Sequence, residues 1–329
     1  MILLSHAPEQ RRTYYGDPAL AALRALDEVR LNTTGRPLAG RDFIAAAEGC
    51  SIVVGDSKAT AASEVFEGLP ALVAYVHGHV DTRGIDIAAA SRRGILVTRS
   101  SQSFGPAVSE LALGFMIDLS RGITVSSMTW RGGGAPETVA SSQLRGRTLG
   151  IVGLGHIGRA LAGVSRALGM RVLAYDPYAA FDHDLGAEPA GFDELLANAD
   201  FVVLLAAVTS ETLNLIDARA LPRMKPTAFL INVSRGELVD EAALENALDR
   251  KLIAGAALDV GSGPFQTPPS RLAARADVLA TPHIGGLTRE AVLEQALETV
   301  RQVASILRGE MSSGALNGDQ AVRFTTPHA

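Results

Sequence analysis

Cysteine and lysine are nearly missing from this chain of 329 residues. The single cysteine, Cys50, excludes an intrachain disulfide and a zinc site built on cysteines, and it fits a reducing cytoplasm. Lysine occurs only at positions 58, 225 and 251, so no lysine-rich patch is available for an anionic membrane surface. The net charge of −5 disfavours a general nucleic-acid binder, because such proteins are usually basic.

Long apolar runs are missing as well. The longest, Phe201 to Val208, has eight residues, whereas a membrane-spanning helix needs about 20. Residues 1–6 have no basic region and too short an apolar run for a signal peptide. We therefore expect a cytoplasmic protein with neither a membrane nor a nucleic acid as its partner.

Apolar residues make up 47 % of the chain and charged residues 20 %, a balance typical of soluble globular domains. The length suggests about two domains of roughly 150 residues. In the first hundred residues, short apolar runs alternate with helical patterns, which predicts a parallel sheet with helices on both faces. The expected strands lie at 2–4, 28–31, 51–54, 71–76 and 95–98, and the expected helices at 18–26, 40–47 and 58–67.

A long amphipathic helix is predicted over residues 105–121, followed by a polar, glycine-rich loop at 131–147. A second alternation of strands and helices then begins. Its expected strands lie at 148–152, 171–175, 201–205, 228–233, 254–258 and 278–280, and its expected helices at 157–168, 192–197, 241–250 and 289–308. Residues 311–329 lack periodicity, and we expect a loose tail there.

A glycine motif follows the first strand of the second series. Gly153, Gly155 and Gly158 form the pattern G-x-G-x-x-G between an apolar strand and a helix, and Asp176 ends the next strand 18 residues later. The glycines permit a tight turn, the approach of a pyrophosphate, and close packing of helix on strand. Asp176 would accept hydrogen bonds from ribose hydroxyls and repel a 2′-phosphate, so the pattern favours NAD over NADP. The alternative is a glycine turn in another doubly wound domain.

Three polar residues follow later strands of the same series. Arg235, Asp259 and His283 each come directly after an expected strand, and ligands bind at the carboxyl ends of parallel strands. An arginine suits a carboxylate and a carbonyl oxygen, an aspartate suits the nicotinamide carboxamide, and a histidine exchanges protons near neutral pH. The alternative interpretation is structural in each case: a surface arginine, a capping aspartate and a hydrogen-bonded histidine.

The ordered set of motifs resembles the D-isomer-specific 2-hydroxyacid dehydrogenase family over residues 70–305. The segments that carry the resemblance are 80–86, 107–110, 148–158, 175–177, 232–236, 256–260 and 281–286. The family implies an α/β fold of two doubly wound parallel-sheet domains. A Rossmann NAD-binding domain, residues 101–287, would be inserted into a flavodoxin-like substrate domain, residues 1–100 and 288–329. The family also implies a homodimer formed through the cofactor domain.

The resemblance assigns roles to individual residues. Arg235 would bind the substrate carboxylate and polarise the keto oxygen, and His283 would be the acid/base. Backbone N–H groups near Val76, His77 and Gly78 would grip the carboxylate. The implied cofactor contacts are Gly153, Gly155, His156, Ile157, Gly158, Asp176, Thr209, Val233, Asp259 and Gly285.

The chain departs from the family at one catalytic position. The family has a glutamate five residues after the aspartate, which orients the histidine, but position 264 here is proline. Three explanations stay open. Gln266 takes the partner role as a neutral acceptor, as a glutamine does in related formate dehydrogenases. A carboxylate from elsewhere, or from the substrate, replaces the glutamate. Or the chain binds NAD and turns over poorly.

The leading hypothesis is therefore an NAD-dependent enzyme that transfers a hydride between NAD(H) and a small 2-hydroxyacid or 2-ketoacid. The alternative is a catalytically weak NAD-binding scaffold or sensor on the same fold. Oxidation of formate or phosphite is a third option. The substrate is not transferable from the family, because His77 and His79 stand in the loop that would hold it.

Overall fold

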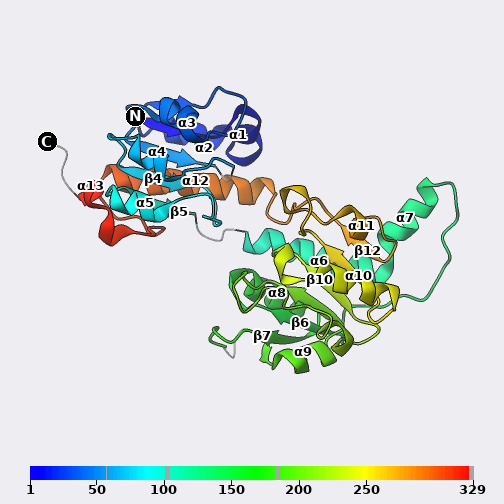
Figure 1. Cartoon of the computed structure of the whole chain (residues 1–329). Helices are drawn as coiled ribbons and strands as arrows, with labels where there is room; N and C mark the ends of the chain where they lie inside the picture. The colour runs from blue at the N-terminus through cyan, green and yellow to red at the C-terminus, as the bar shows by residue number, and fades with distance from the viewer. Residues whose placement is uncertain (57, 101–103, 182–185, 326–329) are drawn as a thin grey trace. The chain divides into compact units, whose positions relative to one another are not determined.

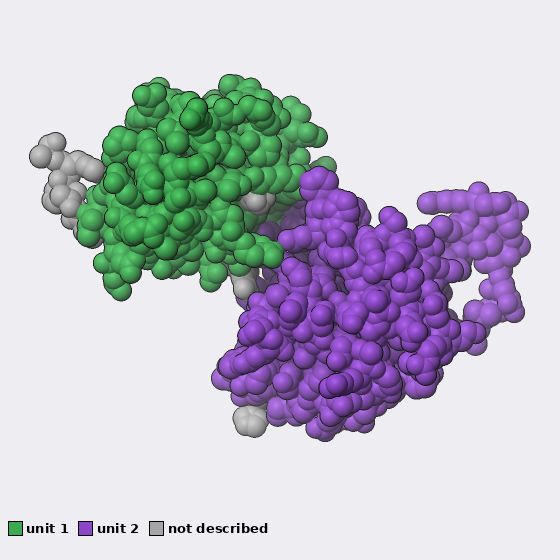
Figure 2. Space-filling model, in the orientation of Figure 1, with its two compact units in different colours: residues 1–103, 289–329 green, residues 104–288 purple. Residues whose placement is uncertain are grey.

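The computed structural model describes residues 1–329 except 57, 101–103, 182–185 and 326–329. The chain forms two compact units (Figure 2). Unit 1 consists of Met1–Ser103 and Arg289–Ala329, and unit 2 consists of Phe104–Thr288. The sequence prediction placed the corresponding boundaries after residues 100 and 287.

Unit 1 is built on a five-stranded, all-parallel sheet with the order β2-β1-β3-β4-β5, the flavodoxin-like order. The strands are β1 (Ile2–Leu4), β2 (Val29–Leu31), β3 (Ile52–Gly55), β4 (Ala74–His77) and β5 (Leu96–Arg99). Alternate strand residues face opposite cores. Leu3 packs with α3 (Gly40–Ala47), α4 (Ser63–Glu67) and α5 (Ile87–Arg92). Ile2 and Leu4 pack with α2 (Gly16–Arg24) and α12 (Arg289–Leu307).

Two parts of the prediction for unit 1 need correction. Helices α1 (Pro8–Tyr14) and α5 were not expected, and the helix expected from residue 58 begins only at Ser63. Helix α1 has no fully buried residue, so no apolar periodicity marked it.

The expected loose tail is also wrong for residues 312–325, which pack along β5, whereas residues 326–329 lie outside the described residues. The Asn317 side chain accepts from Val97 N at 2.8 Å and donates to Ile95 O at 2.9 Å. The guanidinium of Arg323, in α13 (Val322–Thr325), donates to the carbonyls of residues 69, 70 and 72. Such backbone contacts cover the edge of the sheet and leave no hydrophobic pattern in the sequence.

Unit 2 is built on a seven-stranded, all-parallel sheet with the order β12-β11-β10-β9-β6-β7-β8 (Figure 1). The strands are β6 (Thr148–Val152), β7 (Arg171–Tyr175), β8 (Glu188–Pro189), β9 (Phe201–Leu204), β10 (Phe229–Asn232), β11 (Gly255–Leu258) and β12 (Val278–Ala280). The strand order reverses direction at β6, as in a Rossmann sheet. The predicted fold, two doubly wound parallel sheets, is confirmed.

Helices cover both faces of this sheet. Helices α6 (Gly105–Arg121) and α8 (His156–Ala167) pack on one face, and α9 (Phe192–Asn198) and α10 (Glu241–Asp249) pack on the other. Helix α11 (Ser270–Ala273) precedes β12. Helix α7 (Ile123–Arg131) was not predicted, because none of its residues is fully buried. None of the helices in the described ranges is both long and apolar enough to cross a membrane.

Candidate active site

The glycine motif joins β6 to α8 in unit 2, and the structure explains each glycine separately. Gly153 has φ +99°, and a Cβ there would lie 2.5 Å from the backbone nitrogen of Ala206. A Cβ on Gly158 would lie 2.4 Å from the carbonyl oxygen of Gly153. Nothing lies within 4 Å of a Cβ added to Gly155. Packing therefore requires the outer glycines, and the middle one leaves open surface at the helix N-terminus, where a pyrophosphate binds.

Asp176 lies at the end of β7, beside this turn. Its Oδ2 accepts from Leu154 N at 2.8 Å, and its Oδ1 accepts from the backbone nitrogens of Tyr178 and Ala179 at 3.0 and 3.1 Å. A cavity of about 350 Å³ adjoins the carboxylate, and its lining is mainly apolar: Tyr175, Asp176, Pro177, Phe181, Pro189, Ala190 and Gly191. Apolar walls beside a carboxylate suit an adenosine, whose base needs the walls and whose ribose hydroxyls need the acceptor.

Four other predicted cofactor contacts lie at the carboxyl edge of the same sheet. His156 opens α8 and is exposed, Ile157 follows it half-buried, and Thr209 lies in the exposed loop after β9. Val233 is buried directly after β10. These positions surround the strand ends at which a dinucleotide binds in a Rossmann sheet.

Arg235 lies in a hydrogen-bonded turn after β10. The buried Asn232 accepts from Ser234 N at 3.1 Å and donates to Arg235 O at 2.8 Å. Ser234 Oγ ties the turn to Ala206 O at 2.8 Å. The Arg235 guanidinium donates to Ser234 O, and no carboxylate among the described residues forms an ion pair with it. Most of its five N–H donors therefore remain for an anionic ligand.

Asp259 holds the loop that carries His283. Asp259 is buried, and its Oδ1 accepts from Thr281 Oγ1 at 2.6 Å and from Ile284 N at 2.8 Å. Its Oδ2 accepts from Gly285 N at 2.8 Å. His283 has φ +58°, a left-handed conformation that is uncommon for residues other than glycine. Three hydrogen bonds to one carboxylate thus fix a strained backbone at the predicted acid/base.

The ring of His283 faces a backbone carbonyl. Its Nδ1 lies 3.3 Å from Phe265 O, and a carbonyl can only accept, so Nδ1 carries the hydrogen of this contact. Phe265 and Gln266 both have left-handed backbones, with φ 58° and 61°. Within the described residues, the Gln266 side chain makes no hydrogen bond to His283. A backbone acceptor leaves no trace in residue types, so the sequence did not indicate Phe265.

In unit 1, the loop after β4 begins inside the sheet. His77 is the last residue of β4 and follows Val76, and both are buried. Gly78 N donates to Gly55 O at 2.9 Å, so this N–H is used within unit 1. The His77 ring donates from Nε2 to Asp81 O at 2.8 Å, which closes the loop on itself.

Comparison with known proteins decides the family. The model of the NAD-binding domain of D-isomer-specific 2-hydroxyacid dehydrogenases matches residues 113–285. The chain belongs to the D-isomer-specific 2-hydroxyacid dehydrogenase family. NAD is the cofactor that this domain binds, and the glycine motif, the adenosine-sized cavity and Asp176 all lie inside the matched range.

The chain is also similar to individual members of the family. The chain is 39 % identical to a D-3-phosphoglycerate dehydrogenase from Synechocystis sp. over 72 % of its own length and 43 % of that protein. It is 36 % identical to a glyoxylate reductase from Pyrococcus furiosus over 77 % of its own length and 78 % of that protein. The TT0316 protein from Thermus thermophilus has a similar structure, with a TM-score of 0.84 and 28 % identity, over 96 % of this chain and all of that one. The chain spans about half the length of the D-3-phosphoglycerate dehydrogenases that it matches.

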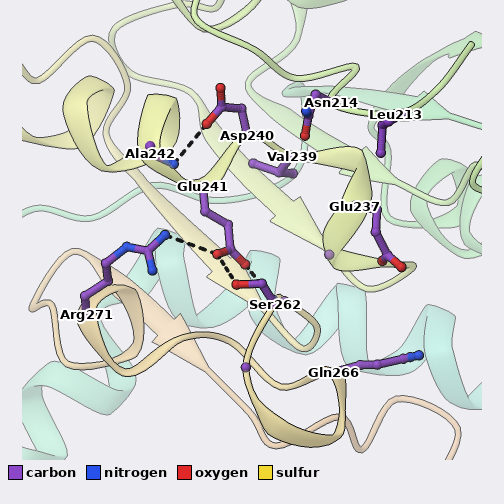
Figure 3. A pocket seen from close by; sticks show the side chains of 13 residues that line it. Leu213, Asn214, Glu237, Val239, Asp240, Glu241, Ala242, Ser262, Gln266 and Arg271 are labelled. Atoms are coloured by element: carbon purple, nitrogen blue, oxygen red, sulfur yellow. Dashed lines mark hydrogen bonds and ion pairs between the residues drawn. The ribbon is translucent and has the colours of Figure 1, made fainter. Parts of the chain in front are cut away.

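A half-buried glutamate, which the sequence did not single out, anchors the loop of Phe265 (Figure 3). The side chain of Glu241, at the start of α10, is only 12 % exposed. It accepts from Ser262 N at 2.7 Å and from Ser262 Oγ, and it pairs with Arg271 at 3.2 Å. These groups line a cavity of about 590 Å³ that Gln266 also borders. Glu241 therefore fixes the near end of the loop that presents a carbonyl to His283.

His6, directly after β1 in unit 1, is another buried group that the sequence did not indicate. Burial, and then repulsion from His79, His77 and Arg11, lowers the pKa of His6 to about 3. An unfolded histidine titrates near 6.5. Above pH 6.5 both states are neutral, and between pH 6.5 and 3 only the unfolded state binds the proton, so stability falls as the pH falls.

This shift predicts acid sensitivity. Lowering the pH from 7 to 5 should cost about 2 kcal/mol of unfolding free energy through His6. Urea unfolding of wild type and of His6→Asn at both pH values measures the effect, and the variant should lose correspondingly less. Exposed His156→Asn is the control and should keep the wild-type loss. An equal loss in wild type and His6→Asn would contradict the assignment.

Proposed function

We propose that this chain is an NAD-dependent oxidoreductase that transfers a hydride between NAD(H) and a small 2-hydroxyacid or 2-ketoacid. The position of Arg235 is the main support for this proposal. Its guanidinium has no carboxylate partner among the described residues, and it lies at the same sheet edge as His283 and the glycine motif. A scaffold that only senses NAD has no use for such an arginine.

The chemistry divides among the residues of unit 2. Bound NAD supplies or accepts the hydride. Arg235 binds the substrate carboxylate and polarises the keto oxygen, because its planar fork fits two oxygens at once. His283 donates from Nδ1 to Phe265 O, so Nε2 is the nitrogen that gives a proton to the forming alkoxide or takes it back in reverse. Asp259 holds the loop that carries His283 in place through hydrogen bonds to its backbone.

A neutral partner replaces the glutamate expected at position 264. The Phe265 carbonyl orients the imidazole and fixes its tautomer, as a carboxylate would, but it adds no negative charge that favours the protonated ring. The acceptor is the backbone of residue 265 and not the Gln266 side chain, so the first of the three explanations is not supported as it was stated.

The direct assay is oxidation of NADH, followed by its absorbance, with a panel of 2-ketoacids from glyoxylate to bulky and phosphorylated ones. We expect turnover in the range of about 1–1,000 s⁻¹ with at least one compound. Clear NADH binding without turnover of any ketoacid would contradict the proposal and favour the scaffold alternative.

Glu241 provides a prediction about positioning. Glu241→Gln keeps the shape but weakens the hold on Ser262 and Arg271, so the Phe265 carbonyl loses its fixed place. We expect kcat to fall about 10-fold with the KM for NADH unchanged, since a misplaced acid/base costs rate and not cofactor affinity. Glu245→Gln is the matched control, because Glu245 pairs with Arg271 without contacting Ser262. Equal effects of the two variants would refute the positioning role.

We also propose a homodimer formed through unit 2. Helix α7 and residues 132–147 extend away from the sheet of that unit (Figure 1). Met128 and Trp130 on α7 are 65 % and 64 % exposed, and Val139 in the extension is 65 % exposed. Exposed apolar side chains gathered in this way are typical of an interface, and the family resemblance implies such a dimer.

Sedimentation tests the dimer. Wild type is expected at twice the chain mass, and Trp130→Glu should shift it to the monomer, because a buried carboxylate would oppose association. Leu307→Glu, an equal change at an exposed leucine of unit 1, should leave the dimer intact. A monomeric wild type, or a Trp130→Glu variant that stays dimeric, would contradict the proposal that this surface forms the dimer.

A further inference from the structure

A hydrogen bond between two exposed side chains of unit 2 joins the loops on either side of the glycine turn. Tyr178 Oη donates to a carboxylate oxygen of Glu211. Tyr178 lies in the loop after β7 and Glu211 in the loop after β9, and β6, which leads into the glycine turn, lies between these two strands. The ends of β7 and β9 are two strand spacings apart, about 10 Å, so only long side chains can connect their loops.

The loop after β7 is held in place at the residue that the cofactor is expected to contact. Asp176 Oδ1 accepts from Tyr178 N at 3.0 Å and from Ala179 N at 3.1 Å. The guanidinium of Arg159, on α8, donates to Ala180 O at 2.7 Å. Tyr178 therefore starts from a fixed backbone next to the carboxylate that suits the ribose of adenosine.

The loop after β9 holds Glu211 in an equally defined turn. Thr212 Oγ1 donates to Ala207 O at 2.6 Å and accepts from Thr209 N at 2.7 Å. Glu211 N donates to Thr209 Oγ1 at 3.2 Å. Among the described residues of the two loops, no other hydrogen bond joins one loop to the other. The link thus consists of two side chains that stand on separately fixed backbones.

Protein stability gives no reason for this link. The Tyr178 side chain is 79 % exposed, and exposed contacts to a charged group add little to the free energy of unfolding. The hydrogen bond to Glu211, and then the charge of Glu211, raises the pKa of Tyr178, so the phenol keeps its hydrogen and remains the donor at neutral pH.

The position of the link points to the adenosine end of the cofactor. Asp176, Pro177 and Phe181, from the same loop as Tyr178, line the cavity of about 350 Å³ that suits an adenosine. A tyrosine ring has apolar faces and a polar tip, so it can cover an apolar ligand while its hydroxyl keeps a hydrogen bond.

We propose that Tyr178 and Glu211 are cofactor-positioning residues whose hydrogen bond closes over the adenosine end of NAD bound at the glycine turn. This inference concerns NAD binding, which the family of the domain establishes, and it holds whether or not a ketoacid is reduced. A bond that must open before the cofactor leaves slows dissociation more than association, so the pair acts mainly on the release rate of NADH.

A double-mutant cycle tests the pair. Tyr178→Phe, which keeps the ring, and Glu211→Ala should each raise the Kd for NADH about 10-fold in a fluorescence titration, mainly through faster release in stopped-flow measurements. The double variant should raise the Kd no further, because either change alone already breaks the bond. Glu310→Ala, at an exposed glutamate of unit 1 that pairs with Arg308, is the control and should keep the wild-type Kd.

ADP-ribose, which carries the adenosine without the nicotinamide, locates the effect. Its Kd, measured by displacement of NADH, should rise by the same factor in both single variants. An unchanged or lower Kd for NADH in either single variant, or additive losses in the double variant, would overturn the proposal. A loss of NADH affinity without any loss of ADP-ribose affinity would also overturn it, because the pair would then act on the nicotinamide end.

Discussion

Replacement of Arg235 by alanine is expected to lower kcat/KM for the best 2-ketoacid by about 10,000-fold. The guanidinium would bind the carboxylate in the ground state and stabilise the negative oxygen that develops in the transition state. A charge-assisted contact contributes about 1.5–3 kcal/mol, and loss of an oxyanion donor costs about 100- to 1,000-fold in kcat. The two losses multiply because one side chain provides both contacts.

The variant should otherwise remain intact. The turn of Arg235 is held by the Asn232 side chain and by Ser234 Oγ, neither of which involves the guanidinium. NADH affinity, measured by fluorescence titration, should therefore stay within about 3-fold of wild type. Exposed Arg219→Ala, in the same unit, is the matched control and should keep full activity. If kcat/KM fell by less than 10-fold in Arg235→Ala, the proposed role of this arginine in the reaction would be wrong.

Replacement of His283 by asparagine is expected to lower kcat by about 100- to 10,000-fold, the range of general acid–base catalysis. Asparagine is the informative choice because position 283 has φ +58°, a conformation that asparagine adopts more easily than most residues. The hydrogen bonds from the loop to Asp259 come from the neighbouring residues, so they should survive the change. The KM for the ketoacid should change little if Arg235 is the main binding group.

The pH profile separates an acid/base role from a structural one. Wild-type reductase activity should fall as the pH rises, because the imidazole must carry the proton that it donates. In His283→Asn the small remaining rate should lose this dependence. Pro264→Glu, which introduces the carboxylate that the family has at this position, should move the fall to higher pH. An identical profile in wild type and His283→Asn would contradict the acid/base role.

The fold and the cofactor motif were predictable because they depend on residue types. Alternating strands and helices, glycines where a Cβ would clash with backbone, and Asp176 at a strand end all leave marks in the sequence. The same is true of Arg235 and His283, which follow strands of a parallel sheet. The structure adds that Asp259 fixes the His283 loop, whereas the sequence suggested either a contact with nicotinamide or a capping role.

The parts of the site and fold that the sequence did not predict depend on backbone groups and on contacts between residues far apart in the chain. The Phe265 carbonyl has no residue-type signature, and Glu241 reaches Ser262 across 21 positions of the chain. Asn317 joins the tail to β5 across 220 positions through backbone hydrogen bonds that no periodicity reports. His6 follows β1, and the charges of His77 and His79 at the end of β4 act on it, a proximity that only the strand order reveals.

The most direct test of the account is the fate of the hydrogen itself. NADH carrying deuterium at the transferable position of C4 should give, with the best 2-ketoacid, a D-2-hydroxyacid with one deuterium at C2, as seen by mass spectrometry and chiral separation. The Arg235→Ala variant, run in parallel, should give almost none. A product without deuterium at C2, or no hydroxyacid despite bound NADH, would contradict the assignment of this chain as a 2-hydroxyacid dehydrogenase.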